Sequence, residues 1–245
     1  MDVNKIKEEF KKHFRKYDLN EPAIIRKYYH SIRVMDISRI IAKYAGFNDN
    51  DAEIAAIVGL LHDYARFEQW TKYQTYSDLK SIDHGDLAVS MLFDNNEIEK
   101  YTKIRDNYDE IYDAIKYHNK IAIPKGLTEH NNLLCKIIRD ADKLDIFYLF
   151  SINKMLLPED GQTISEQVKK DFFDGKLINR TDVSSKNDDV VLGLSMIFDL
   201  NFDYSFEYLI ERNLLWRIYD NINDKERFQD YFEFVDDYIH ERVNK

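Results

Sequence analysis

Three observations predict an all-α fold for this chain. It has only 7 glycines and 3 prolines in 245 residues, too few for a β-structure built from many turns. Apolar residues recur at helical spacing along most of its length. Hydrophobic residues make up 44% of the chain, which is enough for a substantial core. Because we find no internal repeat or long linker, we expect a single all-α domain over residues 1–245.

The first two predicted helices are both amphipathic. Residues 2–17 predict a charged helix with one apolar face. The second helix should begin at Pro22 and end at Gly46, because proline favours the first turn and glycine the position after the last. Its apolar residues occupy two sides, so we expect this helix to be central. His30 lies in one of these two stripes.

A third helix should start near Asn50, where Glu53 stands three residues later as in a capping box. It runs through small and branched apolar residues and ends at the pair His62-Asp63. The polar and aromatic stretch 65–82 shows no sustained helical period. We therefore expect an ordered loop there, with about one turn of helix, and loops of this length are usually functional.

Two further histidines are predicted to face the core. Asp83 can cap a helix that begins at His84, and apolar residues follow at offsets of three, four and seven. A helix over 107–119 places His118 on the same face as Ile111, seven residues earlier. Both imidazoles should therefore point inward.

A helix from about Thr128 to Met155 carries a cluster of acids. Apolar residues at helical offsets put Asp142 on the inner face, with Asp145 on the same side. Asp140 lies nearly opposite and has lysines four residues before and three after it. This spacing is typical of a solvated ion-pair face, so we expect Asp140 to be the weaker ligand candidate.

The C-terminal third predicts more helices. One should follow the loop after Pro158 and end near Gly175. The polar stretch 184–189 is expected to be an exposed connector. Further helices are expected over 190–198, through Leu209 to Ile218, and over 227–243. This part could serve as a cover for the rest of the chain.

Composition limits the compartment and the partners. The net charge is −10 with acids spread along the chain, so we expect no duplex nucleic acid partner, although local cations could still bind a small anionic substrate. The single cysteine, Cys135, leaves no disulfide framework and no cysteine-based zinc site. Nothing at the N-terminus resembles a signal peptide and the apolar runs are too short to span a bilayer. We therefore expect a cytoplasmic protein with no membrane partner.

The residues that could bind metal are imidazoles and carboxylates on the inner faces of these helices. They are His30, His62, Asp63, His84, His118 and Asp142. Such donors suit iron, manganese, cobalt or a water-activating zinc. A lone inward histidine such as His13 is more often a core residue, and the acids of the Asp142 cluster alone would favour surface ion pairs. The six together cannot be buried cheaply without a cation, so the set predicts a metallohydrolase.

This ordered set resembles the HD superfamily of metal-dependent phosphohydrolases, whose pattern is His, His-Asp, later histidines and a final Asp. The resemblance covers about residues 24–150. Its local signatures are Tyr29-His30-Ser31-Ile32-Arg33-Val34, Leu60-Leu61-His62-Asp63, Asp83-His84-Gly85 and Ala141-Asp142-Lys143-Leu144. The chain is similar to bacterial dinucleoside tetraphosphate hydrolases. It is closer still to an uncharacterised bacterial HD-domain branch that has the motifs Arg66-Phe67, Thr75-Tyr76-Ser77-Asp78 and Asp83-His84.

The resemblance implies an HD helical bundle over about 22–155 and a C-terminal helical extension over about 156–245. It also implies one ion held by His30, His62, Asp63 and Asp142. Asp63 can bridge to a second ion completed by His84 and His118. If one ion binds, these two histidines would instead contact substrate phosphate or position water. The metal could be iron, manganese, cobalt, nickel, zinc or magnesium.

The expected reaction is cleavage of a phosphoester or phosphoanhydride bond in a nucleotide or other small phosphorylated molecule, by attack of metal-bound hydroxide. Asp63, Arg66 and Lys143 are the expected catalytic residues, the two cations as phosphate clamps, although both could simply neutralise carboxylates. Aromatic residues in 65–82 could stack on a base or only pack. The alternatives are a di-iron oxygenase of the same fold and a non-catalytic metal-stabilised nucleotide sensor. The C-terminal aromatics fit a homodimer interface as well as an internal cover.

Overall fold

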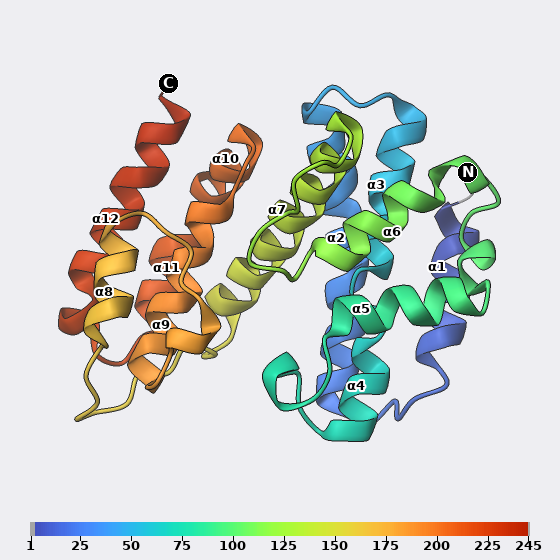
Figure 1. The fold of residues 1–245 in the computed structure, drawn as a ribbon. Coiled ribbons are helices and arrows are strands. Elements are labelled where there is room, and N and C mark those ends of the chain that lie inside the picture. Colours follow the sequence, from blue (N-terminus) through green and yellow to red (C-terminus); the bar gives the residue numbers. More distant parts are fainter. Residues whose placement is uncertain (1–2, 245) are drawn as a thin grey trace. The chain divides into compact units, whose positions relative to one another are not determined.

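The computed structural model describes residues 3–244, and every regular element in that range is helical. The predicted all-α fold is therefore confirmed for the described part of the chain. The chain divides into two compact units, Met1–Ala141 and Asp142–Lys245, and the division falls inside helix α7 (Glu129–Ile152; Figure 1). The prediction of one domain over residues 1–245 stays a prediction.

Between residue 3 and the start of α7, the first unit contains six helices, joined by short 3₁₀ turns and one π-helical turn. They are α1 (Val3–Phe14), α2 (Pro22–Tyr44), α3 (Asp49–Leu61), α4 (Arg66–Tyr73), α5 (His84–Val89) and α6 (Tyr108–Tyr117). Helix α2 lies alongside α3, and α5 packs on α6 (Figure 1). Pro22 begins α2 as predicted, and the Glu21 side chain accepts a hydrogen bond from the Ala23 amide at the N-terminus of the helix.

Helices α2 and α3 approach each other closely at Gly59. A methyl group at this position would lie 2.6 Å from Ser38 Oγ and 2.8 Å from the Val34 carbonyl oxygen. Gly59 has an ordinary helical conformation, so its backbone angles do not require glycine. Glycine is required because a larger residue would clash with α2. The close approach places the end of α3, where His62 lies, against α2.

Two sequence predictions about this unit are wrong. The cap of α3 is Asn48, whose side chain accepts from the Asp51 amide, rather than a capping box at Asn50. The stretch 65–82 is mostly not loop, because it contains the two turns of α4. The helical pattern was hidden because one inward position is the fully buried but polar Gln69, so the apolar residues alone show no period.

Helix α7 corrects a third prediction. Asp140 is fully buried, so it does not belong to a solvated ion-pair face. Its neighbour Lys143 is only 7% exposed and pairs with Asp199 at 2.7 Å, which shows that this face of the helix is not open to water. Asp145 is buried as expected, while Asp142 is partly exposed. Ion-pair spacing alone does not distinguish a solvated face from a buried one.

After α7, the second unit has five helices in its described part, which ends at residue 244. They are α8 (Glu166–Phe173), α9 (Lys186–Ser195), α10 (Asp203–Glu211), α11 (Leu214–Asn221) and α12 (Lys225–Val243). Segment 184–189 is not an exposed connector: Ser185 and Asp188 form a capping box for α9, and Asp188 is fully buried. The helix expected through Leu209 to Ile218 is broken at Asn213, which has a φ of 51°.

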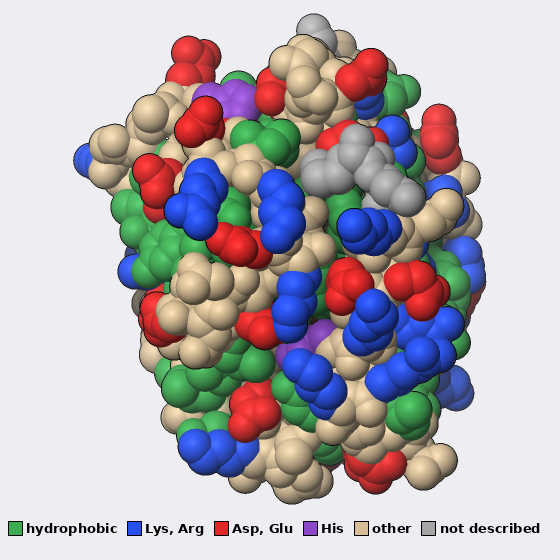
Figure 2. All heavy atoms as spheres, turned by 90° about the vertical axis from the view of Figure 1, so that its right-hand side faces the viewer, with side chains coloured by type: hydrophobic (Ala, Val, Ile, Leu, Met, Phe, Trp, Pro, Cys, Tyr) green, Lys and Arg blue, Asp and Glu red, His purple; other side chains and the backbone are tan. Residues whose placement is uncertain are grey.

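None of the helices within residues 3–244 combines the length and the apolar character that a bilayer span requires. On the face of the molecule in Figure 2, Lys and Arg side chains are interspersed with Asp and Glu side chains. This mixture agrees with the acidic net charge and does not form one continuous basic surface on that face.

Candidate metal centre

Four histidines of the first unit meet around the carboxylate of Asp63. The distances from Asp63 Oδ2 are 3.3 Å to His30 Nε2 and 3.4 Å to His62 Nε2. Those from Oδ1 are 3.4 Å to His84 Nε2 and 3.9 Å to His118 Nε2. All five side chains are buried. They form two overlapping groups of three donors that share Asp63. We call them the first half (His30, His62) and the second half (His84, His118).

Donor spacing in each half fits a single ion. The two Nε2 atoms are 3.2 Å apart in the first half and 2.9 Å apart in the second. Two donors that each bind one ion at about 2.1 Å lie about 3.0 Å apart in octahedral geometry and about 3.4 Å apart in tetrahedral geometry. Imidazole nitrogen and carboxylate oxygen are also the donor types that iron, manganese, cobalt and zinc accept. Both halves therefore have the spacing and chemistry of a metal site.

The backbone sets the orientation of two of these rings. His62 Nδ1 is 2.7 Å from the Gly59 carbonyl oxygen, and His118 Nδ1 is 2.6 Å from that of Ile115. A carbonyl oxygen can only accept, so each Nδ1 must carry the proton and donate it. Each Nε2 is then left with a lone pair that points into the site.

His84 is oriented by a side chain instead. Its Nδ1 is 2.6 Å from Asp78 Oδ2. Burial lowers the pKa of His84, and the nearby cation of Arg66 acts in the same direction, so the ring is neutral. Burial raises the pKa of Asp78, but the hydrogen bond from His84 and other donors outweighs it and holds the pKa well below its usual range. The ionised carboxylate accepts from Nδ1–H, and His84 Nε2 is again the unprotonated atom.

Two unprotonated nitrogens thus face each other at 2.9 Å in the second half. Two lone pairs repel at this distance unless a proton or a cation lies between them, and burial disfavours protonation of His84. A divalent cation between His84 and His118 satisfies both nitrogens and Asp63 Oδ1 together. The residues present therefore fit a bound metal.

Two cations keep Asp63 ionised. Lys27 Nζ lies 2.6 Å from Oδ2, and Arg66 Nε lies 3.2 Å from Oδ1. Burial raises the pKa of Asp63, but the charges of Lys27 and Arg66 outweigh burial and hold the pKa well below its usual range. The carboxylate is therefore available as an anionic ligand at neutral pH.

Arg66 is held on several sides. Besides Asp63, its Nη1 donates to Gln69 Oε1 at 2.7 Å, to the Tyr76 carbonyl oxygen at 2.7 Å and to Asp78 Oδ1 at 3.2 Å. This geometry agrees with the alternative that Arg66 neutralises carboxylates. A role as a phosphate clamp stays a prediction.

The aromatic residues of this region pack against protein. The rings of Trp70 and Tyr76 have centroids 4.8 Å apart, and the Tyr76 hydroxyl donates to the Ala23 carbonyl oxygen at 2.9 Å. Lys27 and Arg66 lie 5.6 and 5.5 Å from the centre of the Tyr76 ring. The packing role that the sequence left open is therefore observed for Trp70 and Tyr76.

The remaining predicted site residues follow the division within α7. Asp142 is the first residue of the second unit, and Lys143 follows it and pairs with Asp199 in that unit. The ligand role of Asp142 and the phosphate role of Lys143 stay predictions. His13 is buried away from the histidine cluster, stacked on Tyr64 with ring centres 3.7 Å apart, as expected for a core residue.

Sequence reasoning did not assign roles to three residues at this centre: Lys27, Asp78 and Asn119. Lys27 precedes His30 by three residues, so helical spacing already puts both on one face. Asn119 directly follows His118. Asp78 belongs to the Thr75-Tyr76-Ser77-Asp78 motif, but no periodic pattern shows that it contacts His84 six residues later.

Comparison with known proteins gives one result. Residues 28–146 match the model of the HD domain. This range contains all six predicted ligands, five in the first unit and Asp142 in the second. No curated protein and no solved structure matches the chain. Residues 28–146 are therefore an HD domain, and the proteins of the HD domain family are mostly metal-dependent hydrolases.

Proposed function

We propose that this protein is a metal-dependent phosphohydrolase that cleaves a phosphoester or phosphoanhydride bond in a nucleotide or another small phosphorylated molecule. One observation carries the proposal: Asp63 offers one oxygen to each of two buried histidine pairs. A carboxylate shared in this way could serve both ions of a two-ion hydrolytic site.

The proposed ligands of one ion are His30, His62 and Asp63, with Asp142 added from the sequence pattern. Those of a second ion are Asp63, His84 and His118. Divalent ions bound there would act as Lewis acids, activate water and neutralise charge on a phosphoryl group. Iron, manganese and cobalt suit these donors best, and nickel, zinc and magnesium remain in the proposal.

The chain supplies fixed cations for a phosphorylated substrate. Lys27 Nζ contacts Asp63, and the Lys27 side chain is 18% exposed to solvent. It can therefore reach both the metal centre and an anion that enters from solvent. We assign it the contact with a phosphoryl oxygen, since charge that develops there needs a positioned cation. Arg66 is 13% exposed, and we assign it mainly the orientation of Asp63.

The substrate is proposed to be small and anionic, because the acidic chain argues against a nucleic acid duplex. Stacking of a base on Trp70 or Tyr76 has little support, since the two rings already contact each other. We place the activity in the cytosol, where the single buried Cys135 would remain reduced.

The test is to load the purified protein separately with manganese, iron, cobalt, nickel, zinc or magnesium and to measure bound metal and cleavage of a panel of phosphoesters and phosphoanhydrides. We expect turnover with at least one metal, and loss of both metal and turnover in His62→Ala and Asp63→Ala. His130→Ala, which removes a histidine outside the cluster, is the matched control.

Three outcomes would overturn the proposal. No cleavage of any substrate with every metal, together with unchanged metal content in His62→Ala and Asp63→Ala, removes its basis. Oxygen uptake by the iron-loaded protein without phosphoester cleavage would favour an oxygenase. Tight nucleotide binding without turnover, whichever metal is present, would favour a sensor.

A further inference from the structure

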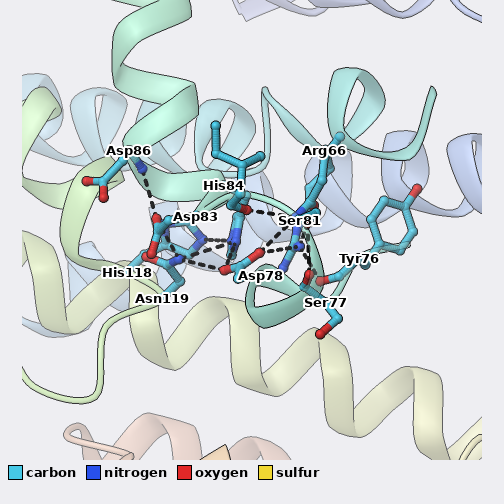
Figure 3. A network of polar contacts seen from close by, with 12 residues as sticks. Arg66, Tyr76, Ser77, Asp78, Ser81, Asp83, His84, Asp86, His118 and Asn119 are labelled. Atoms are coloured by element: carbon cyan, nitrogen blue, oxygen red, sulfur yellow. Dashed lines mark hydrogen bonds and ion pairs between the residues drawn. The ribbon is translucent and has the colours of Figure 1, made fainter. Parts of the chain in front are cut away.

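Asp78 lies at the centre of a network of polar contacts beside the second half of the metal centre (Figure 3). Its Oδ2 accepts hydrogen bonds from His84 Nδ1 at 2.6 Å and from Asn119 Nδ2 at 3.0 Å. Its Oδ1 accepts from Gln69 Nε2 at 2.9 Å and from Arg66 Nη1 at 3.2 Å. Four donors, two from α4, one from α5 and one from the residue after His118, therefore fix one carboxylate.

Gln69 holds the turn that carries this carboxylate. The amide is fully buried, and its Nε2 also donates to Ser81 Oγ at 2.9 Å and to the Ile82 carbonyl oxygen at 3.0 Å. Gln69 Oε1 accepts from Arg66 at 2.7 Å. Gln69 therefore ties Asp78, Ser81 and Ile82 to α4, and Asp78 cannot move without breaking several of these hydrogen bonds.

Asn119 ties the same carboxylate to the start of α5. Its Nδ2 donates to Asp83 Oδ1, the cap of that helix, at 3.1 Å. The 3.2 Å approach of Nδ2 to His84 Nδ1 brings two N–H groups together, so it is not a hydrogen bond in this tautomer. Helices α5 and α6 approach so closely that a methyl group on Gly85 would lie 2.6 Å from Asn119 Oδ1 and 2.9 Å from the Lys116 carbonyl oxygen. The backbone on both sides of His84 is therefore held, and Asp78 decides how its ring is turned.

We propose that Asp78 is a positioning residue for His84: it selects the tautomer with the proton on Nδ1 and aims the free Nε2 at Asp63 and His118. His62 and His118 obtain the same tautomer from backbone carbonyls, whereas His84 obtains it from a carboxylate. The consequence for metal binding rests on the proposed function, but the tautomer itself is a property of the protein alone. A carboxylate partner also makes the imidazole a stronger ligand.

The replacement Asp78→Asn has a predictable direction. An amide has one accepting and one donating end, and the cation of Arg66 together with the Gln69 amide will attract its oxygen. The NH₂ group then faces His84 Nδ1, which must become an acceptor. The proton moves to Nε2, and a metal can bind Nε2 only after the proton has returned to Nδ1, which weakens binding.

The first experiment follows the tautomer by long-range ¹H–¹⁵N correlation spectra of the histidine side chains in metal-free full-length protein at neutral pH. We expect His84 to be protonated on Nδ1 in the wild type and on Nε2 in Asp78→Asn. Asn119→Ala removes a donor from the network but leaves the carboxylate, so it should keep the wild-type tautomer. Thermal unfolding of each variant checks that the fold is retained.

The second experiment measures metal affinity by calorimetric titration with manganese. We expect Asp78→Asn to lower the affinity for one of two ions by about 10- to 100-fold and the affinity for the other by less than about 3-fold. The control Asp94→Asn changes an exposed carboxylate whose hydrogen bond comes from Ser90, and it should leave both affinities unchanged.

The two proposals fail in different ways. If the wild type binds no metal, the proposed function is wrong, while the tautomer result still decides the role of Asp78. If the folded Asp78→Asn protein keeps the proton on Nδ1, or binds both ions as tightly as the wild type, the positioning role is wrong and the proposed function stands.

Discussion

The two halves of the metal centre are built in different ways. His30 and His62 come from α2 and α3, two long helices that meet closely at Gly59. His84 comes from the six-residue α5, after a turn-rich segment, and its ring is oriented by Asp78. The His62 ring of the first half therefore depends on helix packing and a backbone carbonyl. In the second half the His118 ring also uses a backbone carbonyl, and only the His84 ring depends on a network of side chains.

This difference determines which changes each half tolerates. A backbone carbonyl remains when side chains change, so the His62 ring keeps its acceptor unless the helix itself shifts. The Asp78 network loses its function when one charged oxygen is replaced. We therefore expect packing substitutions to affect the first half most and polar substitutions the second.

The largest expected effect comes from the residue that both halves share. Asp63→Ala removes the carboxylate between the two pairs, so metal content should fall in both halves and turnover should fall on the order of 1,000-fold or more. Elemental analysis and steady-state kinetics measure this. Asp36→Ala, an exposed carboxylate on α2 that pairs with Lys7, is the control. Retention of one full equivalent of metal in Asp63→Ala would mean that the halves do not depend on a shared ligand.

The next effect breaks the first half through packing. In Gly59→Ala the new methyl group meets α2 atoms at 2.6 to 2.9 Å, including backbone, so we expect a loss of unfolding free energy of about 2 kcal/mol after the better helix propensity of alanine is included. Urea unfolding measures it. In Gly193→Ala the new group meets only the side chains of Leu156 and Phe150 at 3.0 to 3.3 Å, and the loss should be smaller. Equal losses in the two variants would contradict the packing argument.

A smaller effect tests the second half. Gly85→Ala places a methyl group 2.6 Å from Asn119 Oδ1 and 2.9 Å from the Lys116 carbonyl oxygen, so α5 must move away from α6. We expect the affinity for one ion to fall about 10-fold, with the other within about 3-fold of the wild type. Calorimetric titration distinguishes the two ions, and an equal loss for both would show that the halves are not separable.

The smallest effect concerns a buried histidine outside both halves. Burial lowers the pKa of His13 from 6.5 to about 4. Between these pH values the unfolded chain binds more protons than the native protein, so His13 makes stability fall as the pH is lowered through this window. From pH 7 to 5, His13→Phe should lose on the order of 1 kcal/mol less stability than the wild type.

Thermal and urea unfolding at both pH values measure this difference, and metal content should not change. A lower metal content in His13→Phe would contradict the assignment of His13 as a core residue without a role in metal binding. Identical pH profiles for the two proteins would show that His13 does not stay neutral in the native state.

Local patterns predicted much of the fold and the inward placement of five side chains that the structure brings together, whose role as ligands stays a prediction. Asp83 caps the helix that begins at His84, as expected, because a cap depends on residues three positions apart. Helix α4 was missed because Gln69 is a buried polar residue and interrupts the apolar period. The prediction for Asp140 is wrong because lysines at helical spacing indicated a solvent-exposed face, whereas Asp140 is fully buried.

The sequence alone determined which donors this protein has and that His84 and His118 face inward, since spacing along a helix decides which residues share a face. Only the tertiary structure decided that Lys27 would contact Asp63, that Asp78 would orient His84, and that Gly59 would let two helices approach closely. The physical reason is that these contacts join residues through helix packing and turn geometry, and neither is encoded in the period of a single helix.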